Sequence, residues 1–180
     1  MGLFAIVYPF LVYFGLEFLN HKYVALVFIF ILILRFLFTK SSIAIPWLKP
    51  ATVLGSLVLL STILLDSVTG LLLYPVVINL TLFVVFAWSL YKKPSVIETM
   101  ARIREPELDS HGIKYTEQVT LAWCIFFILN TVVSLYTVWL ADMKIWTLYN
   151  GFIAYLLVGI IFLIELLIRT QVKKRHSNAP

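Results

Sequence analysis

Residues 51–91 read ATVLGSLVLLSTILLDSVTGLLLYPVVINLTLFVVFAWSLY, a long stretch that is almost wholly apolar on both sides of its middle. A membrane-spanning helix needs about 20 apolar residues, so the stretch is far too long for a single crossing. Its only strong turn signal is DSVTG at 66–70, where Asp, Ser, Thr and Gly all favour a break. The stretch therefore predicts two antiparallel membrane helices joined by a tight connection.

The composition of the whole chain agrees with a membrane protein. Of its 180 residues, 62% are hydrophobic and 13% are charged, and the mean hydropathy is +0.99. Soluble domains have about 45–50% apolar and about 25% charged residues. The formal net charge of +5 would suggest nucleic acid in a soluble protein, but in a membrane protein excess Lys and Arg is a topology signal. We expect no nucleic-acid partner.

Six segments are long and apolar enough to be read as membrane helices. They lie at about 3–20, 22–39, 47–66, 70–91, 118–141 and 145–169. We therefore expect one all-α transmembrane domain over residues 1–180, with a loop at 92–117 and a tail at 170–180.

Basic residues orient these segments. If the N-terminus is cytoplasmic, 12 of the 14 Lys and Arg residues fall on the cytoplasmic side, and only Lys22 and Lys144 fall outside. Short loops that face the cytoplasm carry most of the Lys and Arg in membrane proteins. The distribution predicts that both termini and the 92–117 loop are cytoplasmic.

Two charged residues interrupt apolar runs. Arg35 lies in ILILRFLF (31–38) and Glu165 in FLIELLIRT (162–170). A charge in a membrane helix costs about 2.5–3.5 kcal/mol on insertion scales. Both belong near the cytoplasmic ends of their segments, so we predict an intramembrane ion pair between them. The alternatives are pairing of Glu165 with Arg169 on the same helix, or snorkelling of each side chain to the headgroups.

Three asparagines fall within or near consecutive predicted spans: Asn79, Asn130 and Asn150. Asparagine in a membrane helix commonly bonds to a neighbouring helix and contributes about 0.6–2 kcal/mol. The same residues, with Tyr74 and Tyr149, could instead line a polar cavity. Interhelical bonding is the favoured interpretation.

The sequence also carries a faint repeat. YPFLVYFGL (8–16) and YPVVINLTL (74–82) share a Tyr-Pro opening, and each begins a group of three predicted spans. Two groups of three would have opposite orientations, as in many transporters. Agreement by chance is the favoured explanation for so short a match.

The 92–117 loop contains one local folding signal. Ser95 followed by Glu98 is a capping-box pattern, which predicts a short helix at about 95–104. We expect this helix to lie against the inner leaflet or a helix end.

Within that helix, Ile97 and Met100 should turn inward, because they recur at helical spacing. Arg102 and Arg104 make the helix basic. These four residues therefore form a candidate surface for lipid headgroups or for a cytoplasmic partner.

Catalytic and cofactor motifs do not occur in the sequence. It has no HExxH, no Gly-rich phosphate loop, no GxSxG and only one cysteine. The loop carries His111 and several carboxylates, but without metal-ligand spacing, and mixed charge on a solvated loop explains them. We predict no catalytic residue, no cofactor and no metal site, and an enzyme is the least favoured class.

Four stretches within residues 74–169 carry a resemblance: YPVVINLTLFVVFAWSL, PSVIETMARIREPEL, YTEQVTLAWCIFFILN and LYNGFIAYLLVGIIFLIELLIR. In these stretches the chain resembles a bacterial family of small inner-membrane proteins that are encoded among the genes for aryl polyenes and related type II fatty-acid-like products. The resemblance implies the bacterial inner membrane and a setting beside ketosynthases, acyl carrier proteins, an acyl ligase and an exporter. It implies no catalytic residue.

Two classes of function follow. In the first, the protein is a non-enzymatic accessory that anchors soluble acyl-chain biosynthesis enzymes at the membrane. In the second, it is a transporter or flippase for a lipid-like product. The accessory role is favoured because the intramembrane charges lie near the interfaces, whereas a proton-coupled carrier usually places one near the midplane.

Overall fold

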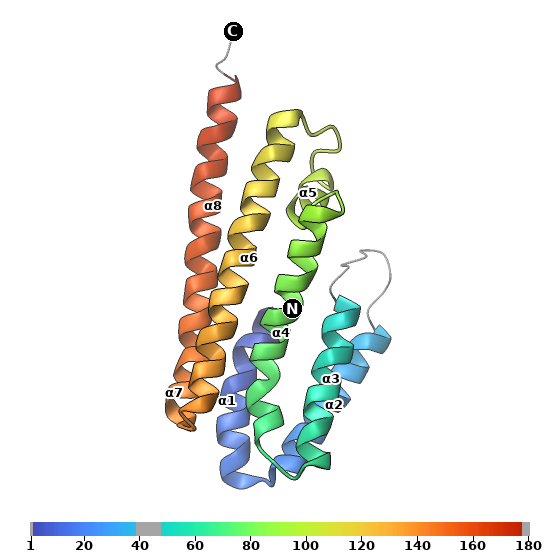
Figure 1. Cartoon of the computed structure of the whole chain (residues 1–180), viewed down its shortest axis with the longest axis vertical. Coiled ribbons are helices and arrows are strands. Elements are labelled where there is room, and N and C mark those ends of the chain that lie inside the picture. Colours follow the sequence, from blue (N-terminus) through green and yellow to red (C-terminus); the bar gives the residue numbers. More distant parts are fainter. Residues whose placement is uncertain (1, 39–47, 178–180) are drawn as a thin grey trace.

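The computed structural model describes residues 2–38 and 48–177, and every regular element within these ranges is a helix. The long helices run back and forth along one axis (Figure 1). They are α1 (Gly2–Phe18), α2 (His21–Phe38), α3 (Leu48–Leu64), α4 (Thr69–Tyr91), α6 (Ser110–Trp139), and a last unit in which α7 (Met143–Leu148), the π-helical turn η1 (Tyr149–Ile153) and α8 (Ala154–Ser177) follow one another directly. A short helix, α5 (Val96–Arg102), lies between α4 and α6. The all-α prediction is confirmed.

Among the described residues, three helices are long and apolar enough to cross a membrane: α4, α6 and the segment Met143–Thr170. At a rise of about 1.5 Å per residue, the 23 residues of α4 span about 35 Å, slightly more than the hydrocarbon core of a bilayer. Apolar parts of α2 and α3, His21–Leu34 and Thr52–Leu64, are shorter. The chain is thus a membrane protein by the length and composition of these helices.

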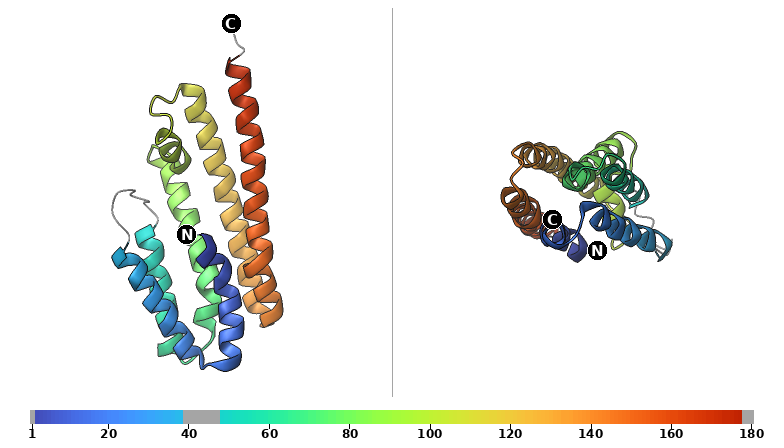
Figure 2. Two further views of the ribbon diagram at one scale, coloured as in Figure 1. Left: turned by 180° about the vertical axis from the view of Figure 1, so that it is seen from behind. Right: turned by 90° about the horizontal axis from the view of Figure 1, so that it is seen from below.

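The bundle is organised around α4, which packs against α3 on one side and α6 on the other, while α2 packs on α3. Helix α1 contacts α7 and η1, so the first helix closes against the last helical unit. Figure 2 shows that α2 and α8 stand at opposite edges of this arrangement. Helices α1 to α3 end about halfway along the bundle, and α4, α6 and α8 continue beyond them with α5 (Figure 1).

Two contacts tie distant helices to α4, and a proline inside α4 explains the first of them. Pro75 has no backbone N–H, so the carbonyl of Leu71 loses its helical partner four residues on. The buried Tyr8 hydroxyl donates to that carbonyl over 2.9 Å. The indole Nε1 of Trp146, also buried, donates to the next carbonyl, that of Leu72, over 3.1 Å. Neighbouring helices thus satisfy backbone groups that lipid could not satisfy.

The two Tyr-Pro pairs of the faint sequence repeat meet here. The ring centroids of Tyr8 and Tyr74 lie 4.5 Å apart, and Phe28 packs on Tyr8 at the same separation. These rings belong to one apolar cluster that joins α1, α2, α3, α4 and α7. A second cluster, around Phe86 and Trp123, joins α4, α5 and α6.

Candidate functional site

One face of α6 carries a polar seam through the interior of the bundle. Seven of the ten buried residues of α6 follow each other at alternating spacings of four and three: Thr116, Thr120, Trp123, Phe127, Asn130, Ser134 and Thr137. This spacing keeps one face of a helix against its neighbours. Small polar side chains on that face let helices approach closely and bond to one another inside a membrane.

Asn130 is the centre of a hydrogen-bonded chain across three elements. Its side-chain nitrogen donates to the side-chain oxygen of Asn79, in α4, over 2.9 Å. Its side-chain oxygen accepts from the Tyr149 hydroxyl of η1 over 2.7 Å. The Asn79 amide in turn donates to the Pro75 carbonyl over 2.8 Å. The structure thus joins α4, α6 and η1 through side chains that the sequence singled out.

Asn150, in η1, forms a second node with residues of α6 that lie about one and two turns beyond Asn130. Its oxygen accepts from the Ser134 hydroxyl over 2.8 Å. Its nitrogen donates to the Thr137 hydroxyl over 3.1 Å and to the Trp146 carbonyl over 3.0 Å. The buried amide therefore uses both of its ends.

The π-helical turn brings these two nodes together. Tyr149 and Asn150 are adjacent in sequence, and both bond to α6. A π turn adds a residue to the local helical repeat, and such turns often lie at functional sites. Gly151 follows, and a side-chain carbon there would lie 3.0 Å from the Phe10 ring, so glycine permits α1 to approach η1.

The polar residues therefore contact one another instead of facing an open space. Asn79, Asn130, Tyr149 and Asn150 all form hydrogen bonds within or between helices, and the Tyr74 ring packs on Tyr8. This arrangement is the one expected of interhelical bonding. A hollow of about 550 Å³, widely open to the outside, is lined instead by Tyr13 and residues 140–144, at the end of the bundle away from α5.

At the other end of the bundle, α5 begins with the capping box that the sequence predicts. The Ser95 hydroxyl accepts from the Glu98 N–H over 3.2 Å, and the Glu98 carboxylate accepts from the Ser95 N–H over 3.4 Å. The next N–H, that of Val96, donates to the Ser89 hydroxyl of α4 over 3.1 Å. Val96 itself is buried against Phe86 and the second apolar cluster.

A buried carboxylate then fixes the shape of the segment. Glu98 is 5% exposed, and one of its oxygens accepts from Nε and Nη2 of Arg102 over 2.9 and 2.8 Å. The remaining guanidinium nitrogen of Arg102 donates to the Pro106 carbonyl over 3.1 Å. Charge-assisted bonds of this kind are roughly twice as strong as neutral ones. The burial of Glu98 was not predicted, although its capping role was.

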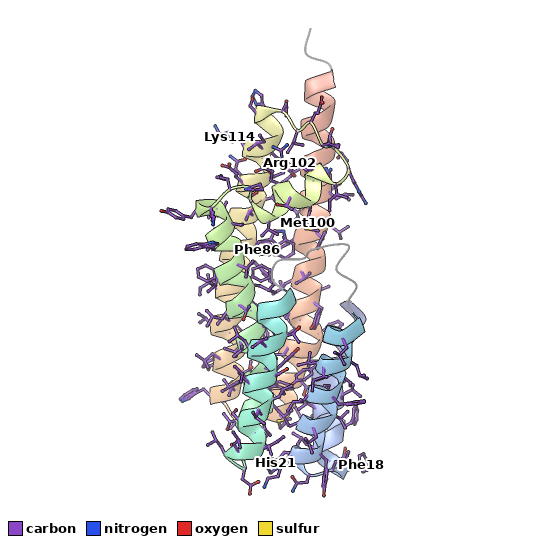
Figure 3. The ribbon with its side chains drawn as sticks, turned by 90° about the vertical axis from the view of Figure 1, so that its right-hand side faces the viewer. Phe18, His21, Phe86, Met100, Arg102 and Lys114 are labelled. Atoms are coloured by element: carbon purple, nitrogen blue, oxygen red, sulfur yellow. The ribbon has the colours of Figure 1, made fainter. Side chains whose placement is uncertain are left out.

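Of the two residues expected to turn inward, Ile97 packs on the helix bundle and Met100 does not. Ile97 packs against the second apolar cluster, but the side chain of Met100 is 51% exposed. Figure 3 shows the reason: α5 lies across the bundle axis, so its first turn rests on α4 and α6 and its second turn projects past them. Val96 and Glu98 occupy the buried positions instead.

Other charged groups near α5 are also partly paired. Lys93 forms an ion pair with Glu117 of α6. The Asp109 carboxylate caps α6 by accepting from the Gly112 N–H over 2.7 Å. Arg104 is exposed. Within the part of the chain that the structure describes, no group of three or more His, Cys, Asp or Glu side chains is arranged to hold a metal ion.

Glu165 of α8 contacts α6. The hydroxyl of Tyr115 donates to the Glu165 backbone carbonyl over 3.2 Å and lies 3.4 Å from a carboxylate oxygen of the same residue. The side chain of Arg35, the partner predicted from the sequence, lies outside the described residues. The helices that carry the two charges stand at opposite edges of the bundle (Figure 2). The Arg35–Glu165 pair stays a prediction.

The connections at the end away from α5 are held by charge. Asp66, between α3 and α4, lies 2.9 Å from both the Lys22 ammonium and a ring nitrogen of His21, which begin α2. The hydrogen bond from Lys22, and next that from His21, lowers the pKa of the Asp66 carboxyl below its ordinary value. Asp66 also adopts a positive φ of 51°, as an aspartate in a tight turn can.

The sequence did not predict the interhelical contacts of three residues. Ser134 and Thr137 complete the node around Asn150, and their positions four and seven residues after Asn130 were a readable signal. Tyr115 had no comparable signal, because its contact with Glu165 joins residues 50 positions apart.

The chain matches no family model, and no curated protein and no solved structure matches it.

Proposed function

We propose that the protein is a non-enzymatic accessory of the bacterial inner membrane that holds soluble acyl-chain biosynthesis enzymes at the cytoplasmic surface. The observation that carries the proposal is the division of polar groups in the bundle. Interior polar side chains bond to each other, whereas charged side chains surround a fixed segment, α5, at one end. A preorganised charged surface suits docking, because little ordering remains to be done on binding.

The membrane arrangement that we propose has six crossings with both termini in the cytoplasm. The three candidate spans and the alternating direction of the helices support it. This topology gathers most basic residues at the end that carries α5, as the positive-inside rule requires of the cytoplasmic end.

The alternative function, transport of a lipid-like product, has less support. A carrier needs polar groups that are free to meet a substrate near the midplane. Asn79, Asn130 and Asn150 are instead engaged with protein partners. The π-helical turn is the feature that favours transport, since an irregular helix can change shape.

The acyl-chain class of the partner rests on the family resemblance of residues 74–169. A pull-down tests it. The tagged protein is solubilised in mild detergent from cells that also produce an acyl carrier protein and a ketosynthase of a type II pathway. We expect the wild-type protein to retain at least one of the two.

A variant with residues 104–107 replaced by Gly-Ser-Gly-Ser should lose this partner, because the change removes the exposed charges of Arg104 and Glu107. It leaves the capping box at Ser95 and the α6 cap at Asp109 in place. Lys144→Ser, an exposed charge at the other end of the bundle, is the matched control and should retain the partner. Equal recovery by all three proteins, or by none, would contradict the recruiting role.

A further inference from the structure

The first observation is the depth of α5. The bond from the Val96 N–H to Ser89 sets the start of α5 beside the last turn of α4. Two aromatic side chains flank that position, Trp88 at 60% and Tyr91 at 84% exposure, with ring centroids 5.8 Å apart. Exposed Trp and Tyr at the end of a membrane helix mark the headgroup level. Helix α5 therefore lies at that level.

The second observation is the direction of α5. In Figure 1 the helix is seen nearly end-on, and in Figure 3, after a quarter turn, it runs across the bundle. A helix perpendicular to membrane-crossing helices lies in the membrane plane. Interfacial helices take this orientation, with an apolar edge toward the acyl chains and a polar edge toward water.

The third observation is the division of side chains between the edges of α5. Met100 lies on the edge that faces back along the bundle, and Arg102 lies on the opposite edge (Figure 3). Ile103, directly after the helix, is 69% exposed, and Met100 is 51% exposed. Two large apolar side chains of this segment are therefore left uncovered by the protein at the level that Trp88 and Tyr91 mark.

The fourth observation is charge. Residues 92–117 contain five basic and five acidic side chains. Arg102 is matched by Glu98, and Lys93 by Glu117. Attraction of about 1 kcal/mol per basic residue to anionic lipid needs excess positive charge near the surface. The segment as a whole has no excess positive charge.

We propose that α5 is an in-plane anchor, and that Met100 and Ile103 insert into the lipid leaflet at the level of Trp88 and Tyr91 by apolar contact, without a requirement for anionic lipid. The occupant of this apolar edge is the bilayer itself. The inference goes beyond the proposed function, since it concerns lipid and leaves the polar edge of α5 free for a soluble partner. Of the surface expected from Ile97, Met100, Arg102 and Arg104, it assigns the lipid contact to an apolar residue, Met100, and not to the two arginines.

Depth-dependent fluorescence quenching in vesicles tests the proposal. Single cysteines are introduced as Met100→Cys, Ile103→Cys and, as the matched control, Glu107→Cys, an exposed site beyond α5. The native Cys124, which is buried, is replaced by alanine, or by serine if the alanine variant does not fold. Each purified full-length variant is labelled with bimane. It is then reconstituted in phosphatidylcholine alone and in phosphatidylcholine with added phosphatidylglycerol.

We expect lipids with a nitroxide near the headgroup to quench the probes at positions 100 and 103 in both kinds of vesicle, and aqueous iodide to quench the probe at position 107. Quenching of positions 100 and 103 by iodide and not by lipid would overturn the proposal and leave that edge to a soluble partner. Quenching by lipid only when phosphatidylglycerol is present would overturn its apolar basis. Protection from both quenchers would overturn it too, because another part of the protein would then cover the edge. The pull-down in detergent does not depend on any of these outcomes.

Discussion

The hydroxyl of Tyr8 should stabilise the bundle through a single backbone group. Pro75 leaves the Leu71 carbonyl without a helical N–H, and Tyr8 supplies the replacement donor at 2.9 Å. Tyr8→Phe removes that donor and keeps the ring. Interhelical hydrogen bonds in membrane proteins average about 0.6 kcal/mol and reach about 1.7. An unsatisfied buried carbonyl costs about 1–3 kcal/mol. We expect a loss of about 1–2 kcal/mol in the free energy of unfolding.

The assay is unfolding by SDS in bicelles, followed by circular dichroism. Tyr13→Phe is the matched control, since it removes a hydroxyl from the same helix, and no hydrogen bond of that hydroxyl is observed among the described residues. Its free energy of unfolding should change by less than about 0.5 kcal/mol, as for substitutions outside specific interactions.

A double-mutant cycle separates this mechanism from a general packing effect. Pro75→Ala restores an N–H that can bond to the Leu71 carbonyl, so Tyr8→Phe should cost much less in that background. If Tyr8→Phe costs the same with proline or alanine at position 75, or costs nothing with proline, the carbonyl is not what the hydroxyl stabilises.

Three further predictions use the same assay. Asn130→Leu removes two interhelical bonds and should lower the free energy of unfolding by about 1–3 kcal/mol; an unchanged value would mean that the chain of polar groups does not hold the helices together. Gly70→Ala should be strongly destabilising, because the added carbon would overlap the Thr62 hydroxyl and lie 2.7 Å from the Val58 carbonyl. Gly159→Ala, with no atom within 4 Å, should be neutral or slightly stabilising. Equal effects would refute the close packing of α3 on α4. The folded-state pKa of Asp66 is lowered. The contribution of Asp66 to the free energy of unfolding should therefore be complete above the ordinary aspartate pKa of about 4 and be lost as the pH falls through the lower folded value. Asp66→Asn should remove that part of the acid sensitivity, and an unaltered pH profile would exclude this contribution.

Local patterns in the sequence were sufficient to predict the helices and one helix cap. The turn at 66–70 separates α3 from α4, as turn chemistry predicts, and the helices agree with the apolar segments to within a few residues over most of their ends. The Ser95–Glu98 capping box also forms, because it needs only residues three positions apart. Such features depend on backbone chemistry within one turn.

Features that depend on which helices meet could not be read in the same way. The sequence showed Arg35 and Glu165 at similar distances from their helix ends, but helix order around the bundle decides whether two such residues meet. Glu165 contacts Tyr115 because α8 lies beside the beginning of α6. For a related reason, the sequence did not show that Met100 would lie off the bundle while Ile97 packs on it. Helical spacing gives a shared face but not the angle at which a short helix crosses its neighbours.

The polar residues inside the bundle favour a fixed assembly over a moving one. In the folded state the asparagine amides already form hydrogen bonds to protein groups. A substrate would have to replace those hydrogen bonds. Because lipid offers no replacement donor or acceptor, breaking the Asn130 chain or the Asn150 node would leave polar groups unsatisfied at a cost of about 1–3 kcal/mol each. A carrier that alternates between two states would have to meet that cost in every cycle. The same bonds cost an anchor nothing, because an anchor needs one stable shape at the membrane and a surface that it can present at one end.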